Sequence, residues 1–201
     1  MIFDADINGN RFISDSTWKI KLHPAYGKTG EPHPNYRLPE RNIHFDATKD
    51  IDGWIESGYD DSDWQNAKAF GTPPVAPWNN LAVRPILQWK NSGLIDYEEV
   101  NIINDPEEGR KYVAKLPANS QVTPYMKIKA PAGIKIDIKT DNYIVGNTYC
   151  LRTEYITKEG IQEFESLSWI NGHEMIYSIP EGIEVIELKY RATGYNAEFT
   201  G

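Results

Sequence analysis

The residues best suited to bind a ligand follow a strand-like stretch that ends near Glu165. Trp169 comes first, and Asn171, Gly172 and His173 come directly after Ile170. A tryptophan ring offers an apolar face to a sugar ring, and amide and imidazole groups can hydrogen-bond the sugar hydroxyls. The alternative is structural, because Asn-Gly is a favoured hairpin turn and the tryptophan can belong to the core. The pattern therefore indicates either a carbohydrate-binding loop or an ordinary turn.

Acidic residues offer two further possibilities. Glu163 and Glu165 lie two apart in a predicted strand and so share one face. Glycoside hydrolysis needs two carboxylates roughly 5–10 Å apart across a sugar-sized cleft. The alternative is that the two side chains lie on the solvated face of a strand. Asp60, Asp61 and Asp63 carry calcium-binding oxygens, but they lack the spacing, glycine and glutamate of an EF-hand loop. A capped turn is the simpler interpretation of this second group.

Zinc and nucleophile motifs are absent from the sequence. The four histidines, His23, His33, His44 and His173, show no His-x-x-x-His spacing, and the single Cys150 excludes a Cys-x-x-Cys pair. There is no Gly-x-Ser-x-Gly elbow and no phosphate-binding glycine loop. One cysteine also excludes an internal disulfide framework.

Composition describes a folded, acidic chain. The 201 residues are 40% hydrophobic and 25% charged, which suffices for one large or two small domains with a core. The net charge of −8 argues against a nucleic-acid partner, because phosphate binding needs a basic surface. No apolar run approaches the ~20 residues of a membrane span, and the first residues do not form a signal peptide. The opening residues enter in mid-strand pattern, so we expect a piece of a longer protein.

Short strands must position the candidate residues. They are predicted at 97–103, 111–116, 122–130, 133–140, 149–157, 161–167, 174–179 and 183–190. Turns rich in Pro, Gly and Asn separate them, among them residues 117–119 and 171–172. Ile134, Ile136 and Ile138 alternate with polar residues, so one face is buried. The pattern predicts an all-β, antiparallel β-sandwich of jelly-roll or galactose-binding-like type.

The N-terminal part is less regular. Asn8-Gly9 predicts a hairpin, and residues 23–41 form a long irregular excursion rich in proline. We expect an N-terminal β portion at residues 1–70, a Pro- and Trp-rich linker at 71–96 and the sandwich at 97–201. Whether the first portion folds separately or donates strands to the sandwich stays open.

Several blocks, taken in order, resemble bacterial α-L-rhamnosidases. They are residues 13–19, 45–47, 53–54, 59–64, 81–86 and 189–195. In that family β-sandwiches come first, and an (α/α)6 barrel with the catalytic carboxylates follows. No helical domain is apparent here, so the resemblance implies a non-catalytic accessory region. Its expected partners are a rhamnosyl glycan and the barrel of the parent chain, and the parent is expected in the periplasm or outside the cell.

The resemblance also selects Asp141-Asn142. Some sandwich domains of this family bind L-rhamnose through a calcium ion held by an adjacent Asp and Asn. Carboxylate and amide oxygens suit this cation, and two vicinal sugar hydroxyls can complete its shell. Asp-Asn is also ordinary turn chemistry, and that alternative stays open. The expected ligand-binding set is Asp141, Asn142, Trp169, Asn171 and His173, with calcium on the first two. The alternative function is a structural or interaction sandwich without sugar affinity.

Overall fold

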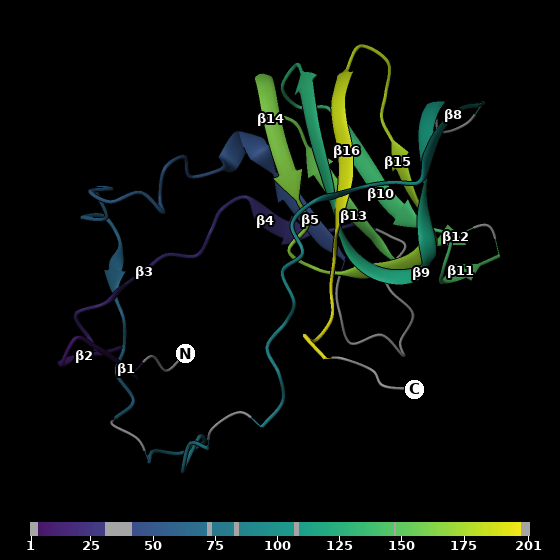
Figure 1. Ribbon diagram of the computed structural model, residues 1–201. Coiled ribbons are helices and arrows are strands. Elements are labelled where there is room, and N and C mark those ends of the chain that lie inside the picture. The colour runs from purple at the N-terminus through teal and green to yellow at the C-terminus, as the bar shows by residue number, and fades with distance from the viewer. Residues whose placement is uncertain are drawn as a thin grey trace. The chain divides into compact units, whose positions relative to one another are not determined.

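The computed structural model in Figure 1 describes residues 4–30, 42–71, 74–82, 85–106, 109–146 and 148–197. Within these ranges the chain consists of strands and turns, with a single 3-10 turn, Ala47–Lys49. None of their helical segments is long and apolar enough to cross a membrane. The predicted all-β, sandwich-like fold is confirmed. Contacts divide the chain into a first unit, Met1–His23 with Ile51–Ile86, and a second unit, Pro24–Asp50 with Leu87–Gly201.

The second unit holds the sandwich. Among the described residues, ten strands are joined in the order β4-β5-β13-β10-β15-β9-β16-β7, with β8 and β14 also paired to β9. Their bounds are β4 Tyr26–Lys28, β5 Ile43–Asp46, β7 Ile95–Asp96, β8 Glu99–Asp105, β9 Gly109–Ala130, β10 Lys135–Thr140, β13 Arg152–Ile156, β14 Gly160–Glu165, β15 Ile170–Ser178 and β16 Glu184–Ala192. A small hairpin of β11, Ile144–Val145, and β12, Thr148–Tyr149, follows β10.

Strand β9 creates the two layers. Its first half pairs with β8 and its second half with β14 and β16, whereas β15 pairs with β9 residues 111–115 and 120–122, on both sides of the corner. Between these halves, residues 116–119 of β9 face only His173 of β15. Pro117 in this stretch has no N–H to give to a ladder, and strands commonly change sheets through such bends. The predicted turn at 117–119 is therefore a corner inside one long strand. In Figure 1, β14 and β16 lie in front of β13, β10 and β15.

Alternating apolar residues form the core between the layers. Ile136 and Ile138 of β10 are fully buried, as the sequence pattern predicted. Tyr155 of β13 stacks on Phe45 of β5, with an interplanar angle of 7°. The ring of Tyr155 also lies 4.6 Å, centroid to centroid, from Phe164 of β14. Because β13 and β14 belong to different layers, this aromatic contact holds the two layers together.

Strands from the predicted N-terminal portion belong to the large sheet. β4 pairs with β5, and β5 pairs in parallel with β13, which is the exception to an otherwise antiparallel sheet among the described strands. Tyr26–Lys28 and Ile43–Asp46, which fall in the predicted N-terminal portion, therefore contribute strands to the large sheet. Much of the predicted excursion, residues 31–41, lies outside the described residues. The linker limits at 71 and 96 stay a prediction.

The first unit exposes its apolar side chains. It contains the hairpin of β1, Asp4–Ile7, and β2, Asn10–Ile13, and the pair of β3, Lys19–Ile20, with β6, Gln65–Asn66. Asn8 and Gly9 have φ of 53° and 79°, as the predicted Asn-Gly turn requires. In the described parts of this unit no residue is buried. Its exposed large apolar residues are Ile7, Phe12, Ile13, Ile20, Leu22, Trp54, Ile55, Phe70, Trp78, Leu81 and Ile86.

Candidate functional site

A polar cluster lies where β10 ends, beside the corner of β9. We call it the corner cluster; it consists of Asp141, Asn142, His173 and Asn119. Asp141 follows β10 directly, and its Oδ1 accepts hydrogen bonds from the backbone N–H of His173 (2.8 Å) and of Glu174 (3.1 Å). Its Oδ2 lies 3.2 Å from Nδ1 of His173. One carboxylate therefore fixes both the backbone and the ring of His173.

Asn142 connects the cluster to β9. Its Nδ2 donates to Oδ1 of Asn119 over 3.3 Å. Its backbone N–H donates to Oγ1 of Thr140 over 3.1 Å, a local bond typical of turns. Asp141-Asn142 thus has the turn geometry that the sequence allowed. It also places polar side chains at the end of β10.

The predicted turn at Asn171-Gly172 is wrong. Both residues belong to β15, where they pair with Gln121 and Ser120 of β9. Gly172 serves a different need: a Cβ there would collide with the Asp141 carboxylate and lie 3.0 Å from Cβ of Thr140. Glycine is required at this position because another side chain approaches its backbone closely.

The structure joins three of the five predicted ligand-binding residues. Asp141 and His173 are hydrogen-bonded, and Asn142 follows Asp141 directly. Trp169 and Asn171 are half-buried, and no hydrogen bond of the described residues joins either side chain to the corner cluster. Asn119 is the member that sequence reasoning missed as a site residue. Its only signal was the turn-like run at 117–119.

The corner cluster has oxygens that suit calcium. One carboxylate and two amide side chains supply fewer than the six to eight oxygens that this cation takes, so ligand hydroxyls or water would have to complete the shell. Both oxygens of Asp141 already accept N–H groups, so the cation would compete with His173 for Oδ2. Among the described residues, no group of three or more His, Cys, Asp or Glu could hold a metal ion. Calcium on Asp141 and Asn142 therefore stays a prediction.

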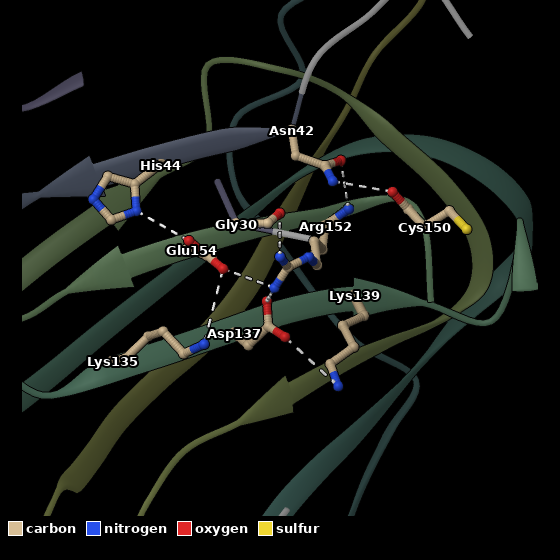
Figure 2. Close-up of polar contacts among 9 residues, drawn as sticks. All are labelled: Gly30, Asn42, His44, Lys135, Asp137, Lys139, Cys150, Arg152 and Glu154. Carbon is tan, nitrogen blue, oxygen red and sulfur yellow. Dashed lines mark hydrogen bonds and ion pairs between the residues drawn. The ribbon is translucent and has the colours of Figure 1, made fainter. Parts of the chain in front are cut away.

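A second cluster, the β13 charge cluster, is formed by side chains of β10 and β13 that alternate with the core residues Ile136, Ile138 and Tyr155. Figure 2 shows its members: Asp137, Lys139, Arg152, Glu154 and, from β5, His44. Its centre is Arg152, which is 5% exposed. The Arg152 guanidinium lies 2.8 Å from the Glu154 carboxylate and 3.5 Å from that of Asp137, and it donates to the carbonyl of Gly30 over 2.9 Å. Lys139 lies 3.6 Å from Asp137. Buried charges are thus paired rather than isolated.

The same cluster fastens β5 to β13. Nδ1 of His44 lies 3.1 Å from the Glu154 carboxylate. The side-chain amide of Asn42 donates to the carbonyl of Cys150 and accepts from the backbone N–H of Arg152, each over 3.0 Å. Figure 2 shows these contacts side by side. They explain how a short parallel strand far back in the sequence is held at this sheet.

Asp137 and Glu154 face each other across β10 and β13 and have pKa values shifted in opposite directions. Burial raises the pKa of Asp137, against the charges of Arg152 and Lys139. Burial would also raise the pKa of Glu154, but the hydrogen bond from His44 and the charge of Arg152 outweigh it and lower that pKa. Glycosidases use carboxyl pairs with such divergent pKa values. Here, however, the two side chains are only 15% and 7% exposed and face protein cations, so the cluster is a structural ion network.

Glu163 and Glu165 also lack the features of a catalytic pair. Glu165 binds Arg191 through two hydrogen bonds of 2.8 and 3.0 Å, and Glu163 lies 2.8 Å from Lys127. These partners lower the pKa of both carboxyl groups. A general acid needs a raised pKa, so neither carboxyl can donate a proton near neutral pH.

Comparison with known proteins finds a likeness of fold. No protein-family model matches the sequence, and no curated protein matches it. The native α-L-rhamnosidase from Aspergillus terreus superposes with a TM-score of 0.60 at 15% identity, over 95% of this chain and 22% of that one. A GH78 family rhamnosidase from Bacillus sp. GL1 gives a TM-score of 0.39 at 24% identity, over 52% of this chain and 12% of that one. The Aspergillus structure shares the fold, and this chain spans less than a quarter of its length.

Proposed function

We propose that this chain is a non-catalytic accessory module of an α-L-rhamnosidase-like glycoside hydrolase. The observation that carries the proposal is the fold likeness, which extends over 95% of this chain but only 22% of the Aspergillus rhamnosidase. The sequence blocks that resemble bacterial α-L-rhamnosidases support the same assignment. The catalytic barrel would then be a separate part of the parent protein, and we propose that the parent works in the periplasm or outside the cell.

The acidic pairs considered above support a role without bond cleavage. Glu163 and Glu165 are neutralised by Lys127 and Arg191, and Asp137 and Glu154 are covered by cations. Hydrolysis of a glycoside would require a raised-pKa acid that faces a sugar-sized cleft. Neither pair meets that requirement.

Within this role, we propose that the corner cluster binds a rhamnosyl glycan. The side chain of His173 is 60% exposed. Asn142 follows Asp141, the residue that holds His173, and the amide of Asn142 is hydrogen-bonded to that of Asn119. Amide and imidazole groups recognise hydroxyls in pairs of donor and acceptor. Calcium at Asp141 and Asn142 would strengthen such binding if sugar hydroxyls complete its shell.

Bracing of the catalytic barrel is the second candidate, and one observation favours it. The first unit exposes Trp54, Ile55, Phe70 and other large apolar side chains, and none of its described residues is buried. Apolar surface of this kind marks contact with another protein or domain. A module that braces the barrel would need no sugar affinity.

Titration calorimetry with L-rhamnose, with and without calcium, tests the sugar proposal. We expect heat at millimolar sugar, a larger affinity with calcium, and loss of both effects in Asn142→Ala. The Leu167→Ser variant, which changes an exposed residue outside the cluster, serves as the control. No heat in either condition would remove the sugar proposal and leave bracing. Turnover of an aryl rhamnoside by the chain alone would overturn the accessory role itself.

A further inference from the structure

We infer that His173 is the hydrogen-bond acceptor of the corner cluster, and that Asp141 is the residue that positions it. In the calcium-free protein Asp141 keeps the proton on Nδ1 of His173, so the lone pair of Nε2 is left for a hydroxyl of the ligand. The identity of the ligand rests on the proposed sugar binding. The state of the imidazole does not, because it follows from contacts within this chain.

The backbone at His173 departs from the regular strand ladder, and this departure allows the contacts with Asp141. The ladder between β15 and β9 is irregular from Gly172 to Glu174, where the corner of β9 begins. The Asp141 carboxylate receives the N–H groups of His173 and Glu174 there, at 2.8 and 3.1 Å. Hydrogen bonds to a carboxylate are stronger than those between neutral groups. Irregular strand segments are frequent where a sheet re-aims a side chain at a site.

The hydrogen bond to the ring sets the tautomer. An ionised carboxylate can only accept, so the 3.2 Å contact between Oδ2 of Asp141 and Nδ1 of His173 requires the proton on Nδ1. In the neutral ring the other nitrogen, Nε2, then carries a lone pair. In metal sites, carboxylate–histidine pairs of this kind fix the tautomer and the orientation of the ring.

Exposure distinguishes this histidine from the other paired one. The side chain of His173 is 60% exposed, and no hydrogen bond of the described residues reaches its Nε2. His44 also has its Nδ1 on a carboxylate, that of Glu154, but its side chain is only 23% exposed and belongs to the β13 charge cluster. Gly172 adds a second sign of a built site, since its missing side chain leaves room for the Asp141 carboxylate.

The neighbouring groups indicate the class of ligand. Asn142 and Asn119 are uncharged amides that both donate and accept; Asn142 follows Asp141 directly and is hydrogen-bonded to Asn119. An imidazole acceptor next to amides suits a neutral polyhydroxyl compound better than an anion, because an anion would meet a lone pair and a carboxylate. A sugar with vicinal hydroxyls is such a compound.

Nitrogen-15 NMR of the full chain tests the positioning claim without any ligand. At about pH 8.5, where an ordinary imidazole is neutral, we expect His173 as the Nδ1–H tautomer. In Asp141→Asn the amide oxygen can still accept the backbone N–H groups, while the amide nitrogen faces Nδ1 and donates to it. We therefore expect the proton to move to Nε2 in that variant. An Nε2–H tautomer of His173 in the unmodified protein would overturn the inference.

A pair of substitutions tests the acceptor role. In His173→Gln the longer amide reaches the place of Nε2, whereas in His173→Asn it reaches only that of Nδ1. In calcium-free L-rhamnose titrations we expect a loss of about tenfold or more for His173→Asn and Asp141→Asn, and a few-fold at most for His173→Gln. His44→Asn is the matched control and should bind unchanged. Equal losses in the two His173 variants would refute the acceptor role. An absence of sugar binding in the unmodified protein would contradict the sugar proposal. The NMR result would still test whether Asp141 positions His173.

Discussion

Two carboxylates that face each other across β10 and β13 should respond very differently to neutralisation. Glu154 lies 2.8 Å from the guanidinium of Arg152 and 3.1 Å from Nδ1 of His44. Asp137 lies 3.5 Å from the same guanidinium, and its buried Oδ1 has no hydrogen bond. We expect Glu154→Gln to destabilise the protein strongly and Asp137→Asn to have little effect.

The magnitudes follow from what each change leaves behind. Glu154→Gln removes the carboxylate that lies 2.8 Å from the buried guanidinium of Arg152, while the more distant carboxylate of Asp137 stays at 3.5 Å. Removing one partner of a buried ion pair costs roughly 3–5 kcal/mol, so with Asp137 still present we expect about 2–4 kcal/mol. Asp137→Asn removes a carboxylate whose charge is disfavoured by burial. Arg152 keeps Glu154, and Lys139, which loses its 3.6 Å contact with Asp137, keeps the ring face of Tyr149 at 5.0 Å. We expect its free energy of unfolding to stay within about 1 kcal/mol of the original.

The pH dependence separates the two groups further. The lowered pKa of Glu154 means that its contribution is present above its ordinary value of 4.5 and is lost as pH falls through the lower folded-state value. The raised pKa of Asp137 has the opposite sign: stability decreases as pH rises from 3.8 through the higher folded-state value. Glu154→Gln should therefore lack the loss of stability that Glu154 causes as the pH falls below 4.5. Asp137→Asn should lack the loss of stability that Asp137 causes as the pH rises above 3.8.

Urea unfolding at pH 7 and at steps down to about pH 3 provides the measurement, with the slope m checked for constancy between variants. Hydrogen exchange at the amides of β5 and β13 gives a local readout, because the cluster fastens these strands together. If Asp137→Asn proves the more damaging change at pH 7, the assignment of Arg152 to Glu154 as its main partner is wrong.

Further consequences can be measured on the same protein. Gly172→Ala should cost about 2–4 kcal/mol and release the His173 ring from Asp141, seen as a lower urea midpoint and a changed tautomer by NMR, because the new Cβ meets Asp141 and Thr140. Tyr177→Phe should cost about 1–3 kcal/mol in urea unfolding, since its buried hydroxyl bonds that of Tyr97 at 2.7 Å. Calcium at a hundred times its dissociation constant should add about 2.7 kcal/mol, and Asn142→Ala should abolish this gain; an equal gain in the variant would place the cation elsewhere. Ile55→Ser should stay within about 0.5 kcal/mol, since this side chain is 74% exposed.

The sequence predicted what depends on local pattern. Alternation along 134–140 predicted β10 with Ile136 and Ile138 inside, and Asn8-Gly9 predicted the first hairpin. Local pattern failed at Asn171-Gly172, where the usual turn pair lies inside β15. The reason is a tertiary contact: glycine is needed at position 172 because the carboxylate of Asp141, thirty-one positions earlier in the sequence, lies against its backbone. No periodicity in the sequence predicts such a contact.

The corner cluster could not have been assembled from the sequence because β9 creates it. A break between predicted strands at 117–119 indicates only a turn, whereas one strand that bends there brings Asn119 to Asn142, twenty-three positions away. The same bend carries β9 from one layer to the other, and it leaves the N–H of His173 to the carboxylate of Asp141. The layers and the polar cluster therefore share one cause. A change that straightens β9 at this corner should disturb the sandwich and the orientation of His173 together, whereas a change in the β13 charge cluster should loosen β5 and leave His173 as it is.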